Sequence, residues 1–164
     1  MKFLVDAMLG KLSRFLRIFG FDTIYANDLI DYYHADPVPD EKLKQYAEKY
    51  DRIIITKDLP FYQKMREKSI FLEGKGVYNY LNQLQVKLKL NYNFDIENAR
   101  CSICNAILKK VENRNSIKNL VKPETFKNYT EFYQCNNPSC NKVFWHGPHI
   151  IDINKKIKNE ADIQ

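Results

Sequence analysis

Short apolar runs alternate with amphipathic stretches along residues 1–90. The apolar runs are typical of buried strands, and they cover residues 3–5, 22–26, 52–56 and 70–72. Apolar residues at helical spacing predict helices over residues 9–19, 40–50 and 59–68. A last amphipathic helix carries Val77, Leu81, Leu84 and Leu88. This alternation predicts an α/β fold, in which helices cover a parallel sheet.

The pattern changes at residues 91–100, which are polar and without clear periodicity. All four cysteines and the single tryptophan follow this stretch. We therefore expect one domain over residues 1–92 and a second, smaller domain over residues 93–153. The polar residues 154–164 are expected to form a loose tail.

The charge balance of the chain bears on its partner. The 164 residues include 26 Lys and Arg against 20 Asp and Glu, a formal net charge of +6. This excess favours a polyanion as partner, although a basic surface that only aids solubility fits the charge equally well. No apolar run reaches the roughly 20 residues of a membrane helix, and the N-terminal apolar patch is too short for the core of a signal peptide. We expect a cytoplasmic protein without a membrane partner.

Three acidic residues stand where open α/β sheets bind their ligands, beyond the carboxyl ends of the strands. Asp6 directly follows the first predicted strand, Asp58 follows the third, and Asp40 begins a helix. If the first and third strands are neighbours, these carboxylates converge. Their oxygens suit Mg²⁺ or Mn²⁺, which can activate water for attack on a phosphodiester. The sequence therefore indicates a catalytic site formed by Asp6, Asp40 and Asp58.

Each acid also has a structural interpretation. Asp40 and Asp58 both precede or begin helices, where an aspartate commonly acts as a cap. The middle acid is also open to other residues, namely Glu41 or one of the loop residues Asp28, Asp31 and Asp36.

The helix that follows Asp6 has one apolar side and one basic side. Lys11, Arg14 and Arg17 fall opposite its leucines and phenylalanines at 100° per residue. The basic side is either a solvated charged face or, next to Asp6, a surface for phosphate groups. We take Lys11, Arg14 and Arg17, with Lys57, as candidate nucleic-acid-binding residues.

The cysteines form two close pairs with the spacing of metal-binding turns, Cys101 with Cys104 and Cys135 with Cys140. In an intracellular chain such pairs favour zinc over disulfides or unrelated thiols. Four thiolates complete a tetrahedral zinc site and leave no open position, so this zinc is expected to be structural. The strand-like segments around the cysteines fit a zinc ribbon.

Two alternatives remain for this C-terminal region. His146 or His149 could replace one cysteine in the zinc site. The aromatic residues of the region are mostly expected in its core, although one or two could stack on bases, and its lysines could grip RNA or be merely solvated.

Several of these motifs together resemble one known family. The segments FLVDAMLGKLSRFLRIFGFDT (3–23) and DEKLKQYAEKYDRIIITKD (40–58) are similar to the PIN-like ribonuclease family named after the C-terminal domain of the mut-seven exonuclease. FWHGPH (144–149) follows its cysteine-rich segment, as in the family. The resemblance implies a PIN-like, Rossmann-like fold with a C-terminal zinc ribbon, metal-dependent cleavage of RNA, and pairing into homodimers. Asp6 and Asp58 match family acids, Asp40 is the best placement for the middle one, and Lys57 stands where the family commonly has arginine.

Two functions therefore compete. In the first, the protein is a metal-dependent ribonuclease whose zinc ribbon assists RNA binding. In the second, it is an RNA-binding module of the same fold without catalysis. A haloacid-dehalogenase-type phosphatase is disfavoured, because Met8 occupies the position two residues after Asp6 where that chemistry needs a second aspartate.

Overall fold

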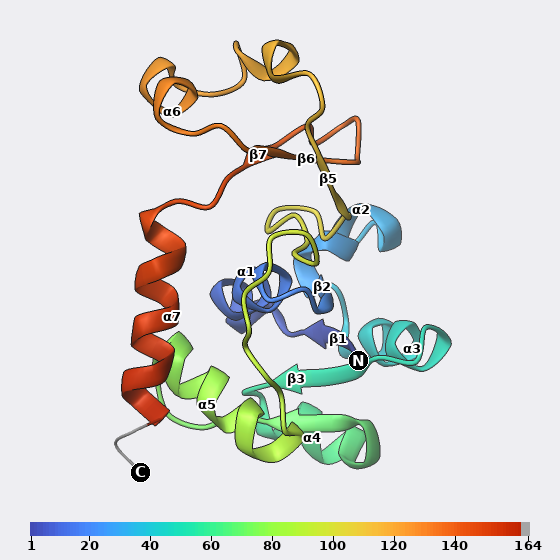
Figure 1. The fold of residues 1–164 in the computed structure, drawn as a ribbon. Coiled ribbons are helices and arrows are strands. Elements are labelled where there is room, and N and C mark those ends of the chain that lie inside the picture. The colour runs from blue at the N-terminus through green and yellow to red at the C-terminus, as the bar shows by residue number, and fades with distance from the viewer. Residues whose placement is uncertain (162–164) are drawn as a thin grey trace.

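The computed structural model describes residues 1–161 and contains two sheets (Figure 1). The larger sheet has four parallel strands in the order β2-β1-β3-β4. They are β1 (Lys2–Val5), β2 (Asp22–Tyr25), β3 (Ile53–Thr56) and β4 (Ser69–Phe71). The chain passes from β1 to β2 and then returns across β1 to β3. The predicted parallel sheet and the neighbouring positions of β1 and β3 are confirmed.

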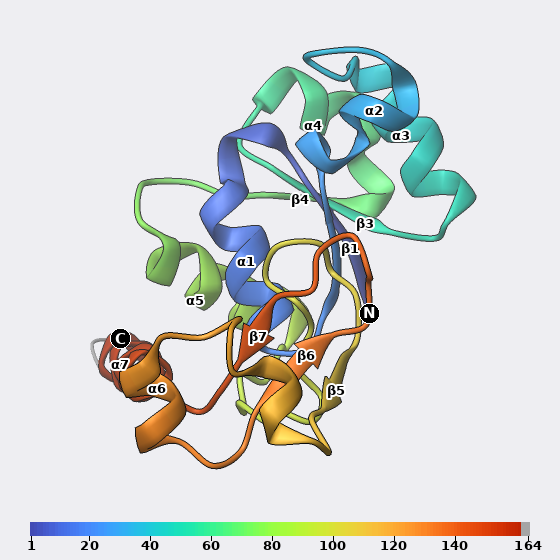
Figure 2. The ribbon, with the colours of Figure 1, turned by 90° about the horizontal axis from the view of Figure 1, so that it is seen from above.

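Helices cover both faces of this sheet, because successive strand residues point to opposite sides. Phe3 and Val5 belong to a core with α1 (Gly10–Ile18) and α5 (Val77–Leu88). Leu4, between them, belongs to a second core with α3 (Asp40–Lys49) and α4 (Leu59–Met65). The short α2 (Ile30–Tyr33) lies on the same side as α3 and α4 (Figure 2). The connecting 3₁₀ turns are Ala7–Leu9, Ala26–Leu29 and Arg66–Lys68.

The second sheet lies in the C-terminal part and has three antiparallel strands in the order β5-β6-β7. They are β5 (Leu108–Lys110), β6 (Tyr133–Cys135) and β7 (Val143–Phe144). A 3₁₀ turn over Arg114–Ile117 and the helix α6 (Pro123–Asn128) connect the first two strands. Phe132 and Tyr133 are buried, which confirms that aromatic residues contribute to the core of this part.

The chain ends in a helix that returns to the first sheet. Helix α7 (Pro148–Ala161) packs against α5, and its Ile153 is buried in the core shared with α1 and α5 (Figure 1). The expectation of a loose tail from residue 154 is therefore wrong as far as Ala161, because an apolar stripe fastens the helix to the N-terminal part. None of the helices within residues 1–161 has both the length and the apolar character needed to cross a membrane.

Candidate active site and metal centre

Asp6 and Asp58 meet through the side chain of Thr56 at the carboxyl edge of the large sheet. The Thr56 hydroxyl donates a hydrogen bond to Asp6 Oδ2 at 2.6 Å and accepts one from the Asp58 backbone N–H at 2.9 Å. Thr56 is fully buried, so both contacts are held in place. Two acids 52 positions apart thus lie at one rim, at the point where the strand order reverses and where such sheets bind ligands.

Asp58 also caps α4, as its structural interpretation predicted. Asp58 Oδ1 accepts a hydrogen bond from the Phe61 backbone N–H at 2.8 Å. The cap engages one carboxylate oxygen, and a carboxylate has a second oxygen for another partner. Capping therefore fixes the orientation of Asp58 and is compatible with metal binding.

Asp40 behaves differently, because it is the first residue of α3 and not its cap. Pro39 occupies the N-cap position, and no side-chain cap is formed there. Partial burial raises the pKa of Asp40, and the nearby Asp58 and Asp6 carboxylates raise it further, whereas Lys64 lowers it. Asp40 therefore experiences the negative charge of both other acids, as a member of one acidic cluster would.

The three carboxylates do not form a tight set of ligand atoms. Among the described residues, the four cysteines are the one group of three or more potential ligands whose atoms all lie within 4.8 Å of one another. Repulsion between uncompensated carboxylates favours such an open arrangement. Of the alternative middle acids, Asp28 is already bound to Arg17 and to the Tyr25 backbone N–H, while Asp31, Asp36 and Glu41 are exposed.

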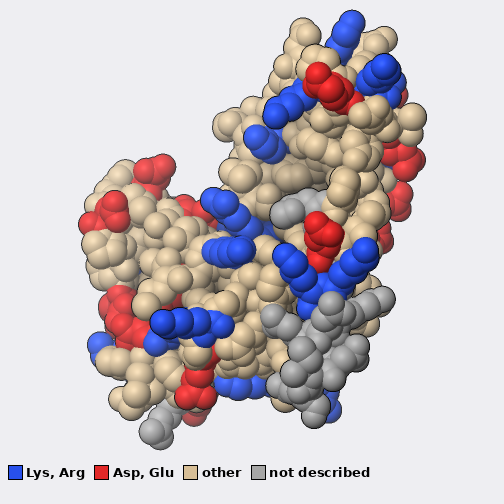
Figure 3. Space-filling model, turned by 90° about the vertical axis from the view of Figure 1, so that its left-hand side faces the viewer, with Lys and Arg blue, Asp and Glu red and all other residues tan. Residues whose placement is uncertain are grey.

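Two of the four predicted nucleic-acid-binding residues are exposed, and the other two have partners within the protein. Lys11 and Arg14 are exposed on α1 and line a groove of about 600 Å³. Lys57 donates to the Gly74 carbonyl at 2.8 Å and lies over the Tyr80 ring at 5.3 Å, so its ammonium has partners within the protein. Figure 3 shows the side toward which β3 points in Figure 1, where Lys and Arg side chains gather around a hollow below the C-terminal lobe.

Arg17 is buried, which makes its assignment to the nucleic-acid surface wrong. Its side chain is 2% exposed. The guanidinium donates to the Thr23 carbonyl at 2.9 Å, to the Ser102 and Ile103 carbonyls at 3.2 and 2.9 Å, and to Asp28. The carbonyl acceptors lie on β2 and on the turn between the first two cysteines, which covers this side of α1, whereas Asp28 lies in the 3₁₀ turn Ala26–Leu29. Arg17 therefore joins the two parts of the molecule.

Asn105 makes a second connection between the cysteine turn and β2. It adopts a left-handed backbone conformation with φ of 65°, which asparagine tolerates better than most residues. Its side chain accepts from the Thr23 backbone N–H at 3.0 Å and donates to Asp22 at 2.8 Å. The sequence alone does not indicate this contact, which requires the relative placement of both parts.

The four cysteines converge as predicted. The Sγ atoms of Cys101 and Cys140 are 3.7 Å apart, and those of Cys104 and Cys135 are 3.3 Å apart. These separations exclude disulfide bonds, whose sulfurs are about 2.0 Å apart. A tetrahedral zinc site with metal–sulfur bonds of about 2.3 Å has sulfurs about 3.8 Å apart. The four thiols therefore fit a metal ion such as zinc.

The surroundings of three of the thiols shift their pKa values, which links metal binding to the release of thiol protons. Burial raises the pKa of Cys101 and of Cys135, whereas at Cys104 the effect of burial is outweighed by the Ala106 backbone N–H and the neighbouring thiols, which lower the pKa. Because a metal binds thiolates, loading this site releases protons.

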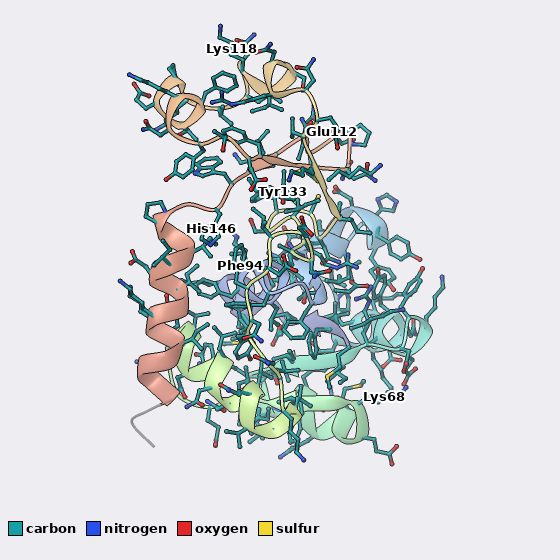
Figure 4. All side chains as sticks on the ribbon, viewed as in Figure 1. Lys68, Phe94, Glu112, Lys118, Tyr133 and His146 are labelled. Atoms are coloured by element: carbon teal, nitrogen blue, oxygen red, sulfur yellow. The ribbon has the colours of Figure 1, made fainter. Side chains whose placement is uncertain are left out.

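Histidine is not part of this ligand set among the described side chains. The His146 ring instead lies 5.5 Å from the Phe94 ring, where the two side chains face each other beside the start of α7 (Figure 4). The side chain of His149 is outside the described part of the structure.

A family model described as Mut7-C RNAse domain matches residues 1–157. The chain belongs to this family. The match spans both the acidic rim and the cysteine cluster, so these two features belong to one Mut7-C unit. The family description indicates a nuclease with RNA as its substrate. Neither the curated proteins nor the solved structures include a significant match to this Mut7-C chain.

Proposed function

We propose that this Mut7-C protein is a PIN-like ribonuclease that hydrolyses RNA phosphodiester bonds with the help of Mg²⁺ or Mn²⁺. The observation that carries the proposal is the contact of Thr56 with both Asp6 and Asp58 at the switch point of the sheet. The electrostatic influence of both acids on Asp40 supports a shared site of three carboxylates.

In this proposal Asp6, Asp40 and Asp58 hold the catalytic metal. Hard divalent cations prefer carboxylate oxygens and retain several waters. When bound, such a metal supplies an activated water and stabilises the charge on the leaving oxygen. The protein contributes orientation: Thr56 fixes Asp6, and the cap of α4 fixes Asp58.

Zinc has a structural role in the proposal. Four thiolates leave no position for a substrate or a reactive water. Arg17 and Asn105 fasten the turn at Cys101 and Cys104 to β2. A loaded zinc site would thereby stabilise the C-terminal part of the molecule, which assists RNA binding.

Two further expectations belong to the proposal. Unpaired thiols suit a reducing compartment, which supports a cytoplasmic location. Pairing into a homodimer rests on the family resemblance alone, and light scattering of the purified protein tests it.

The proposal is tested by cleavage of labelled RNA with and without Mn²⁺ or Mg²⁺. We expect wild-type protein to cut only with metal, and Asp6→Asn and Asp58→Asn each to lower the rate at least about 100-fold, since each removes a charged ligand of the reacting metal. Asp152→Asn is the matched control, because Asp152 is exposed on α7. Unchanged metal-dependent cleavage in both site variants contradicts the catalytic assignment. RNA binding without cleavage under either metal instead favours the non-catalytic module.

A further inference from the structure

A groove runs beside the acidic rim, between α1 and the first cysteine turn. Its volume is about 600 Å³, within the range of roughly 300–1,000 Å³ typical of small-molecule sites. Lys11 and Arg14 line it from α1, Ser102 lines it from the cysteine turn, and Tyr25 lines it at the end of β2. The groove therefore has two cationic groups, the rings of Tyr25 and of the buried Phe15, and a wall from each part of the molecule.

Tyr25 connects this groove to the acidic rim. Its hydroxyl donates to the Ala7 carbonyl at 2.9 Å, and Ala7 directly follows Asp6. Burial, Asp28 and Asp6 all raise the pKa of Tyr25, so the phenol remains protonated and keeps donating. The ring therefore stands next to the backbone that carries the first catalytic acid.

The ring of Tyr25 is also fixed in position. A Cβ atom at Gly10 would lie 3.1 Å from the ring, so the absence of a side chain there permits the close approach. The Tyr25 backbone N–H donates to Asp28, which Arg17 holds in turn. A side chain held at its backbone N–H and at its hydroxyl loses little freedom when a ligand packs on its ring.

The opposite wall is held by the same arginine. Arg17 binds the Ser102 carbonyl at 3.2 Å and the Ile103 carbonyl at 2.9 Å, which places the cysteine turn against α1. The groove thus depends on the docking of the cysteine turn, and the two exposed cations of α1 line it.

We propose that this groove binds single-stranded RNA, with an unpaired base stacked on Tyr25 and adjacent phosphates bound by Lys11 and Arg14. The inference rests on the proposed ribonuclease function, because it places the stacked nucleotide next to the bond to be cut. Aromatic rings stack on bases of any sequence, and Lys and Arg bind the backbone. In a duplex the faces of the bases are covered by their neighbours, so a paired strand cannot use Tyr25. The substrate class is therefore single-stranded RNA, or unpaired regions of folded RNA.

The test measures RNA binding by fluorescence anisotropy, without added Mg²⁺ or Mn²⁺ and with the Asp6→Asn variant as parent so that the probe stays intact. The probes are a labelled single-stranded oligoribonucleotide and the same strand in a blunt duplex. We expect the single strand to bind at least about 10-fold tighter. Tyr25→Leu should weaken single-strand binding about 5- to 100-fold, the range for loss of one stacking contact. Tyr25→Phe keeps the ring and should bind within about threefold of the parent.

A second pair of variants tests the cations independently of the ring. Replacing Lys11 and Arg14 together by alanine should reduce the slope of log affinity against log salt by about 1.4, since each phosphate contact contributes about 0.7 on a single strand. Lys2→Ala is the control, because Lys2 is exposed at the amino end of β1, away from the carboxyl ends of the strands where the acids lie. Thermal unfolding confirms that each variant is folded.

Equal affinity for the duplex and the single strand overturns the inference. A folded Tyr25→Leu variant that binds RNA like the parent also overturns it. So does an unchanged salt slope in the variant that lacks Lys11 and Arg14. These results are separate from the cleavage test. If the groove variants bind RNA as predicted but the wild-type protein shows no metal-dependent cleavage, the RNA-binding groove is supported and the ribonuclease function is contradicted. If cleavage depends on the acids but the groove variants bind RNA like the parent, the ribonuclease function is supported and the groove is contradicted.

Discussion

Replacement of Arg17 by alanine is expected to be strongly destabilising, although the residue lies on the charged side of its helix. The guanidinium is buried and makes hydrogen bonds to three carbonyls and to Asp28. Two of these carbonyls belong to the turn between Cys101 and Cys104, so the variant also loses two hydrogen bonds between the two parts.

The magnitude follows from what the substitution leaves behind. Removing one member of a buried ion pair costs roughly 3–5 kcal/mol. Asp28 retains a side-chain exposure of 32%, so water compensates part of its lost partner and the lower end applies. The Thr23 carbonyl is buried, and an orphaned acceptor adds roughly 1 kcal/mol or more. We therefore expect a loss of about 3–4 kcal/mol in the free energy of unfolding, which lowers Tm by about 6–16 °C for a chain of this size.

Thermal and guanidinium unfolding of zinc-loaded protein measure this loss. Arg14→Ala is the matched control, because Arg14 is an exposed arginine one turn away on the same helix, and it should change stability by less than about 0.5 kcal/mol. Arg17→Lys should recover little, since an ammonium cannot present donors to all these acceptors at once. A loss below about 1 kcal/mol in Arg17→Ala, or equal losses at both arginines, refutes the role of Arg17 as the joint between the two parts.

Three further predictions concern charge and metal. Burial raises the pKa of Asp22, but hydrogen bonds from Arg52 and Asn105 outweigh this effect, and the net pKa shift is downward. A lowered pKa stabilises the folded state at pH values above 3.8, the ordinary pKa of the group. This stabilisation is lost as the pH falls through the pKa of the folded state. Asp22→Asn should therefore flatten the fall of Tm between about pH 5 and pH 2, and an unchanged pH profile contradicts this. In metal-free protein, Asp58→Asn should lower the pKa of Asp40, because the negative charge of Asp58 raises that pKa. A carbon-13 NMR titration of the Asp40 carboxyl measures the change, and an unaltered titration midpoint disproves the coupling between the two acids. Removal of zinc with a chelator should lower Tm and expose the amides of residues 100–105 to hydrogen exchange, and unchanged protection there argues against a structural metal.

The local pattern of the sequence was sufficient for the large sheet and its acids. The apolar runs gave the four strands, because buried parallel strands need little else to be seen. Thr56 ends the third of these strands and Asp58 lies just beyond it, so their proximity to Asp6 required only that β1 and β3 be neighbours. The close cysteine pairs likewise predicted a common site, which the Sγ distances confirm.

Features formed between distant segments could not be predicted in this way. A helical projection places Arg17 beside Lys11 and Arg14, yet residues 100–105 cover only its part of the helix. The charge of Arg17 is tolerated because carbonyls more than 80 positions away accept its hydrogen bonds. The sequence does not single out Tyr25 for the same reason, since its neighbours in the groove come from α1 and from the cysteine turn. The terminal helix is not evident from the sequence, because its apolar stripe lies within a strongly polar segment.

The central claim is that Asp6, Asp40 and Asp58 share one divalent ion. Paramagnetic broadening by Mn²⁺ of the carbon-13 carboxyl signals of the aspartates tests it most directly. We predict that these three signals broaden together at substoichiometric Mn²⁺, while the signal of exposed Asp152 remains sharp. Broadening of only one of the three, or of none before Asp152, contradicts the shared site.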